Sequence, residues 1–150
     1  MEKDALSELK KTLNFQRAGL GMHVGRQGLD AYGIRSTDKG FSFNRVEIKS
    51  TRINRKITEK FVLSRLKVDK SGLQQGSRLY GHDRLEKAFQ SGNIWARFVM
   101  SRKASMGMGR CWMSADYIYF KNVRTGEKKL FRVFSNRAGN RIARLKRILL

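Results

Sequence analysis

Three leucines near the start of the chain repeat at the spacing of an α-helix. Leu6, Leu9 and Leu13 would share one face of such a helix, and Asp4 is placed to cap its first turn. Because the positions between them are mostly polar, that face would pack against a core while the other faces water. The pattern therefore predicts a helix over residues 4–15.

The next pattern is typical of a β-hairpin. Residues 29–36 and 41–51 are rich in aromatic and β-branched side chains, and they flank the turn-forming stretch TDKG. If TDKG is a four-residue loop, Ser36 pairs with Phe41 and the numbers of opposite residues add up to 77. The glycine-rich residues 19–28 before it predict an irregular segment or a short strand.

The second half of the chain predicts a mixture of helices and strands. Asp83 could cap a helix in which Leu85, Ala88 and Phe89 face inward, with Gly92 at its end. The pattern of residues 52–70 fits neither a helix nor a strand clearly. The remaining predictions are a buried strand over 93–102, a loop over 103–110, a short strand over 111–113, a helix start over 114–122, a strand over 128–134 and an amphipathic, helix-like segment over 140–150.

This order of elements predicts a mixed α/β (α+β) fold, a mixed β-sheet flanked by helices. The chain has 150 residues, 40% of them hydrophobic, and contains no proline and no linker-like stretch. We therefore expect a single domain over residues 1–150. The start of the chain lacks the apolar region of a signal peptide, so a cytoplasmic location is expected.

Charge narrows the range of partners. The chain carries 33 Lys and Arg against 12 Asp and Glu, a formal net charge of +21. Such a surface favours polyanions, and nucleic acid is preferred to membrane because no apolar run approaches the roughly 18 residues of a spanning helix. One cysteine and two histidines provide neither a disulfide nor a zinc site of the usual spacing. No membrane and no small-molecule cofactor is expected.

The hairpin brings scarce acids together. In the register that adds up to 77, Asp30 lies opposite Glu47, and opposite Cβ atoms of an antiparallel pair are about 4.5 to 5.5 Å apart. Two carboxylates at this distance can share one divalent cation. Because side chains alternate along a strand, Lys49 lies on the same face as Glu47, while Val46 and Ile48 point to the other.

Such a group of side chains is suited to phosphodiester hydrolysis. A magnesium ion on two carboxylates keeps several waters and can polarise a phosphoryl oxygen, while a neighbouring lysine can orient or deprotonate the attacking water. The alternative is structural: Glu47 and Lys49 form an exposed pair and Asp30 is a loop acid. Short motifs of this kind are common by chance, and the hairpin spacing together with the basic surroundings favours the catalytic interpretation.

The same residues resemble the PD-(D/E)xK nuclease superfamily, whose core motif is an Asp, a variable hairpin and E-x-K on the following strand. More narrowly, GRQGLDA (25–31) followed by EIKS (47–50) is similar to PvuII-type restriction endonucleases. The predicted strand over 93–102 and helix over 114–120 also resemble the elements that follow the catalytic strand in that family. The similarity covers about half of the chain.

The resemblance implies a restriction-endonuclease-like fold and a homodimer that cuts both strands of DNA, as a restriction or homing endonuclease. It implies that Asp30, Glu47 and the carbonyl of Ile48 ligate Mg²⁺ and that Lys49 assists the water. Gln27 stands where those enzymes carry an additional acid and is included among the catalytic candidates. The histidine-rich segment that reads bases there is absent, so the recognised sequence and the number of metals stay open.

Basic residues around the hairpin are the candidate DNA contacts, because lysine and arginine neutralise backbone phosphates. They are Arg26, Arg52, Arg55, Lys56, Lys60, Arg65, Lys67, Arg78 and Arg102. Glu8 on the first helix is interpreted as a solvated acid rather than as support for the site. Two other functions remain: a noncatalytic nucleic-acid-binding protein, and a junction-resolving nuclease of the same superfamily.

Overall fold

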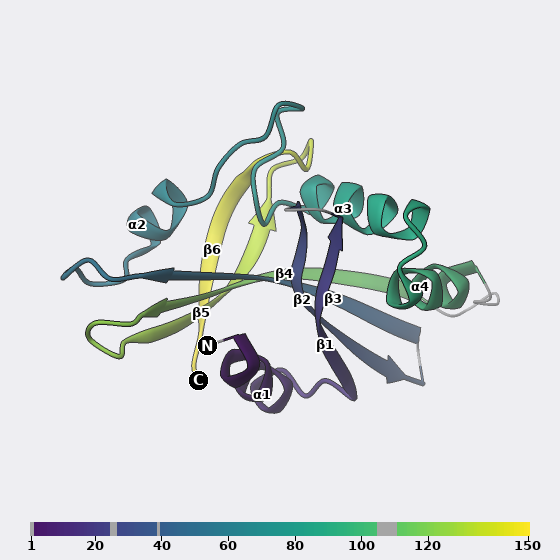
Figure 1. Ribbon diagram of the computed structural model, residues 1–150, viewed down its shortest axis with the longest axis horizontal. Helices are drawn as coiled ribbons and strands as arrows, with labels where there is room; N and C mark the ends of the chain where they lie inside the picture. The colour runs from purple at the N-terminus through teal and green to yellow at the C-terminus, as the bar shows by residue number, and fades with distance from the viewer. Residues whose placement is uncertain (1, 25–26, 39, 105–110) are drawn as a thin grey trace.

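A six-stranded sheet runs through the molecule, with its strands in chain order from β1 to β6 (Figure 1). The computed structural model describes residues 2–24, 27–38, 40–104 and 111–150. The strands are β1 (Arg17–Val24), β2 (Gln27–Thr37), β3 (Gly40–Thr51), β4 (Cys111–Asn122), β5 (Lys128–Ser135) and β6 (Ile142–Ile148). All neighbours are antiparallel except β3 and β4, which are parallel.

Helices cover both faces of this sheet, so the fold is a mixed α+β fold, as predicted. They are α1 (Glu2–Thr12), α2 (Glu59–Ser64), α3 (Arg78–Gln90) and α4 (Ile94–Ala104). A parallel strand pair needs a crossover connection, and α2, α3 and α4 lie within the crossover between β3 and β4. Helix α1 packs against the opposite face (Figure 1). None of the helices in the described part of the chain is long and apolar enough to cross a membrane.

The core has a layer on each side of the sheet. Under α1, Leu9 packs with Val46 and Ile48 of β3. On the other face, Phe43 packs with Leu85 of α3, and a neighbouring cluster gathers under α2. The two central strands therefore bury side chains on both faces, whereas β1 and β6 lie at the edges.

The hairpin is the element that the sequence predicted best. Strands β2 and β3 pair in the expected register, with Ser36 opposite Phe41 and Ala31 opposite Val46. The first helix is also confirmed, although it begins at Glu2, so Asp4 lies inside its first turn and is not the cap. The glycine-rich segment before the hairpin includes most of β1, which pairs with β2.

Several predictions for the second half were wrong. Helix α3 begins at Arg78 and is capped by the Ser77 side chain, which accepts a hydrogen bond from the Tyr80 N–H, so Asp83 is not a cap. The predicted strand over 93–102 is helix α4, and Asn93 caps it by accepting from the N–H groups of Trp95 and Ala96.

The chain after α4 also differs from its prediction. The predicted helix start over 114–122 belongs to the long strand β4, and the amphipathic segment at the end of the chain forms strand β6. The strand over 128–134 is confirmed as β5. The ambiguous residues 52–70 contain the short helix α2 between irregular stretches. Most of the loop predicted over 103–110 lies outside the described residues.

Candidate active site at the end of strand β3

The three side chains that the sequence singled out lie together. Asp30 directly precedes Ala31 on β2 and Glu47 directly follows Val46 on β3, and Ala31 and Val46 are paired at this end of the hairpin. One carboxylate oxygen of Asp30, Oδ2, accepts a hydrogen bond of 2.8 Å from the N–H of Ile48, which ties the β2 acid to the β3 backbone. The Lys49 ammonium lies 3.3 Å from Oε1 of Glu47. Strand alternation therefore places both acids and the amine on the face that α2 and α3 cover.

Glu47 sits where its charge is disfavoured. Its side chain is 7% exposed, against 26% for Lys49. The pKa of the Glu47 carboxyl is raised to about 7: burial raises it most and the nearby charge of Asp30 adds to this, while the charge and hydrogen bond of Lys49 act in the opposite direction. A buried carboxyl facing a second carboxylate is an environment that a divalent cation would stabilise, because the cation replaces the proton.

Helix α3 supplies neighbours of Glu47 that the sequence analysis missed. Tyr80 is buried, and its pKa is raised first by burial and then by the charge of Glu47. Arg84, one turn further, places its guanidinium carbon 4.3 Å from the centre of the Tyr80 ring. It also pairs with Asp83 and, at 2.9 Å, with Asp69. The i, i+4 spacing of a tyrosine and an arginine on a helix was the available signal.

A buried ion pair lies where α3 packs over strand β3. Arg45 of β3 donates two hydrogen bonds, of 2.7 and 2.9 Å, to the carboxylate of Asp116 on β4. Gly81 of α3 lies so close that a Cβ atom there would overlap the Arg45 guanidinium. Because Arg45 and Glu47 are two residues apart on one strand, the pair and the acid share a face. Close packing of Gly81 on the Arg45–Asp116 pair therefore brings α3 near Glu47.

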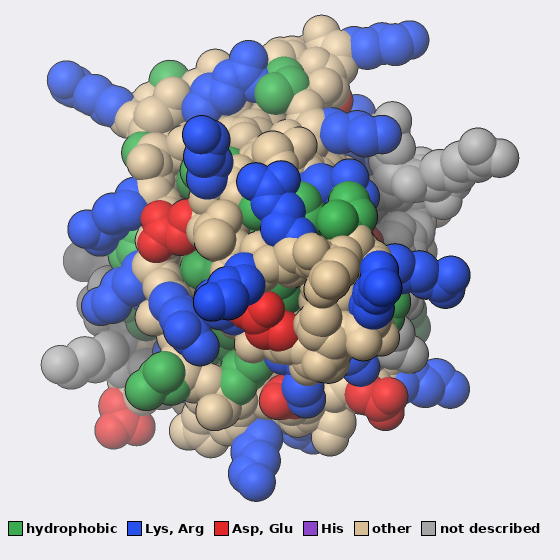
Figure 2. All heavy atoms as spheres, turned by 90° about the vertical axis from the view of Figure 1, so that its left-hand side faces the viewer, with side chains coloured by type: hydrophobic (Ala, Val, Ile, Leu, Met, Phe, Trp, Pro, Cys, Tyr) green, Lys and Arg blue, Asp and Glu red, His purple; other side chains and the backbone are tan. Residues whose placement is uncertain are grey.

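Most of the predicted DNA contacts lie near this end of β3. Arg52, Arg55 and Lys56 follow the strand, and Lys60, Arg65 and Lys67 lie on or after α2; all six are exposed. Figure 2 shows the side of the molecule on which α2 lies, where Lys and Arg side chains are spread over the surface with a few acids among them. One of these residues, Arg55, stacks on the ring of Phe61 at 5.1 Å. A polyanion near Glu47 would therefore meet a cationic rim.

The other predicted residues are placed differently. Arg78 is the first residue of α3 and donates to the backbone carbonyl of Arg137. Arg102 is on α4, at the opposite end of the molecule from α2 in Figure 1, so the structure does not bring it to the site. Arg26 and the side chain of Gln27 lie outside the described residues. The Ile48 carbonyl as a metal ligand stays a prediction.

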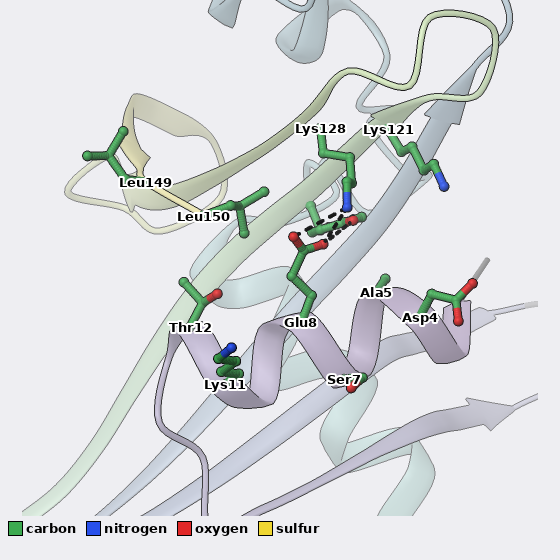
Figure 3. Close-up of a pocket in the computed structure, with 11 residues that line it drawn as sticks. Asp4, Ala5, Ser7, Glu8, Lys11, Thr12, Lys121, Lys128, Leu149 and Leu150 are labelled. Carbon is green, nitrogen blue, oxygen red and sulfur yellow. Dashed lines mark hydrogen bonds and ion pairs between the residues drawn. The ribbon is translucent and has the colours of Figure 1, made fainter.

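Glu8 does not belong to the site. It lies on α1, across the sheet from Glu47, in a pocket of about 730 Å³ between α1, β4, β5 and the last residues of the chain. There it accepts a hydrogen bond of 2.8 Å from the Tyr119 hydroxyl and pairs with Lys128 at 3.3 Å (Figure 3). It is therefore a partly buried, partnered acid rather than a solvated one.

The donor set suits magnesium. In the described part of the chain, no three or more His, Cys, Asp or Glu side chains converge as a metal-binding group. Magnesium is commonly held by one or two carboxylates while waters and substrate phosphates complete its octahedral shell, so Asp30 and Glu47 are a sufficient protein contribution.

Comparisons of this chain with protein-family models, with curated proteins and with solved structures gave no match.

Proposed function

We propose that the protein is a magnesium-dependent endonuclease that hydrolyses phosphodiester bonds of double-stranded DNA. The observation that carries the proposal is the buried Glu47, whose pKa is raised to about 7 beside Asp30, with the Lys49 ammonium 3.3 Å away. A structural salt bridge needs only one acid for one amine. A second acid, fixed against the β3 backbone, makes sense where a hard cation is to be bound.

Each side chain then has a role. Asp30, oriented by the Ile48 N–H, and Glu47 hold the ion, which when bound would act as a Lewis acid on the phosphoryl oxygen. Lys49 is placed to orient the attacking water and to offset negative charge in the transition state. The water oxygen forms the new bond to phosphorus, the bond to the leaving sugar oxygen breaks, and a proton ends on that oxygen.

The charge distribution supports DNA as the substrate. A net charge of +21 and the exposed cations after β3 provide a sequence-independent attraction to closely spaced phosphates. The proposal extends to a sequence-specific enzyme of restriction or homing type, which acts as a homodimer in the cytoplasm. A dimer would place one site on each strand of the duplex, and sedimentation of the protein with and without DNA tests it.

The test is cleavage of phage or plasmid DNA with Mg²⁺, with chelator, and by the variants Asp30→Asn and Lys49→Ala. We expect cleavage only with Mg²⁺ and a loss of at least about 100-fold in either variant, because each removes a charged group from the reacting centre. DNA binding should survive in both. The matched control is Glu8→Gln, which removes an acid on the opposite face and should cut at the wild-type rate.

Two outcomes would contradict the proposal. If both site variants cut like the wild type, the acids and the amine have no catalytic role. If tight, salt-sensitive binding occurs without cleavage of any DNA, the protein is a noncatalytic nucleic-acid-binding protein. A preference for four-way junctions over linear duplex would instead indicate a junction-resolving nuclease.

A further inference from the structure

A second pocket opens directly beside Lys49. Its volume is about 340 Å³, and it is lined by Lys49 and Ser50 at the end of β3 and by Ser64, Arg65 and Lys67 at and after the end of α2. Three of its five lining residues are cationic and none is acidic. The lysine that pairs with Glu47 therefore also forms one wall of this pocket, so the pocket and the candidate active site are adjacent.

The cationic wall is held by the fold. Leu66, between Arg65 and Lys67, is buried in the core under α2. The side-chain oxygen of Gln75 accepts from the N–H of Lys67 at 3.1 Å, and the N–H of Gln75 donates to the Lys67 carbonyl at 2.9 Å. An anchored backbone presents its two cations with less ordering cost than a free loop would, so a ligand binds more tightly.

The side chains of the pocket are suited to an anion. The Ser64 hydroxyl already donates to the carbonyl of Phe61 at 2.6 Å, so it can only accept a hydrogen bond from a ligand. The donors of the pocket are the ammonium groups of Lys49 and Lys67 and the guanidinium of Arg65. Ammonium and guanidinium donors, with no carboxylate among the lining residues, are the chemistry that recognises a phosphate.

We propose that this pocket binds a phosphate of the substrate strand together with its sugar, next to the phosphate that is hydrolysed. Its volume lies near the lower end of the roughly 300 to 1,000 Å³ of small-molecule sites, which is room for a nucleotide-sized group rather than for a lone anion. Phosphates follow one another at about 3.4 Å of helix axis along a strand, so a strand held at Glu47 continues past Lys49. The inference rests on the proposed function for the identity of the ligand.

The direct test is binding of thymidine 5′-monophosphate to the metal-free protein, followed by amide chemical shifts in NMR spectra. We expect saturable shifts at Ser50, Arg65 and Lys67, no such shifts with thymidine, and loss of the shifts in Arg65→Gln/Lys67→Gln. The control Arg137→Gln/Lys146→Gln removes the same charge from exposed positions outside the pocket and should bind like the wild type. Unsaturable shifts spread over the whole basic surface would overturn the proposal.

A second measurement uses duplex DNA and the Asp30→Asn variant, so that it does not depend on cleavage. The logarithm of the DNA-binding constant falls linearly with the logarithm of the salt concentration. One lost phosphate contact should make this slope less steep by about 0.9 in Arg65→Gln/Lys67→Gln, and by less than about half of that in the control pair. Equal slopes in both pairs would contradict the pocket while leaving the nuclease proposal intact. Conversely, if the protein does not cut DNA, both measurements can still show that the pocket binds a phosphate.

Discussion

At the scale of single residues, burial of Glu47 disfavours the charged form of the side chain, which is the form that the proposed metal site needs. Its pKa is raised from 4.5 to about 7, mainly by burial. The folded state therefore binds the proton more tightly than the unfolded state does. The contribution of Glu47 to stability is most favourable where both states are protonated, below about pH 4.5, and it is lost as the pH rises through 7, where the folded protein holds a buried charge.

We compare the free energy of unfolding of the Glu47→Gln variant with that of the wild type, both without metal. Between pH 4.5 and pH 8 this difference should shift in favour of the variant by on the order of 3 kcal/mol. Glutamine has no charge to bury at any pH. Urea unfolding of both proteins across this pH range measures the difference, in which the titration of groups remote from Glu47 cancels. A difference that does not change with pH would mean that Glu47 is not destabilised in the folded state. Magnesium should stabilise only the wild type.

The three main site residues could be predicted from the sequence because strand geometry is local and periodic. Once TDKG fixed the register, the placement of Asp30 against Glu47 and Lys49 followed by counting. Tyr80 and Arg84 could not be predicted in the same way, because their distance from Glu47 depends on how α3 packs over β3. That packing is set by Gly81, Arg45 and Asp116, which are separated in sequence and meet only in the folded chain.

At the scale of elements, the contact between α3 and β3 depends on one missing side chain. We expect Gly81→Ala to lower the free energy of unfolding by about 1 to 3 kcal/mol, because its methyl group would overlap the Arg45 guanidinium and displace it from Asp116. The same variant should weaken Mg²⁺ binding at the neighbouring Glu47. Thermal unfolding with and without Mg²⁺ measures both effects.

The matched control for this variant is Gln90→Ala, which changes an exposed residue at the end of the same helix. It should leave both quantities within about 0.5 kcal/mol of the wild type. If Gly81→Ala behaves like this control, α3 does not hold the buried pair in place, and the role given to Gly81 is wrong.

The two longest elements that were predicted wrongly, β4 and α4, have different physical causes. Strand β4 is buried on both faces, with Tyr117 and Tyr119 under α1 and Ile118 and Phe120 under α2, so its apolar residues are continuous and give no strand period. Helix α4 has the opposite problem, because its aromatic and β-branched residues favour a strand locally. Its cap, Asn93, was the signal that could have identified it.

At the scale of the whole molecule, the site stands on the most protected part of the sheet. Strand β3 is bonded to β2 on one side and to β4 on the other, and β4 is bonded to β3 and β5, whereas β1 and β6 each have one partner within the sheet. We expect hydrogen exchange measured by mass spectrometry to be slowest in peptides from β3 and β4 and faster in β1 and β6. Exchange in β3 as fast as in β6 would mean that strand β3 opens independently of the sheet.

The parallel pairing of β3 with β4 also has a consequence for biosynthesis. Paired residues of the two strands are 71 positions apart, as for Arg45 and Asp116. The strand that carries Glu47 and Lys49 therefore lacks one of its neighbours while the ribosome makes the intervening helices. Until residues 111–122 have left the ribosome, Asp30 and Glu47 have been synthesised, but β4 is not yet available to pair with β3. The proposed nuclease would thus become active only after translation has passed that point, and prematurely terminated chains would not cut the DNA of the cell that makes them.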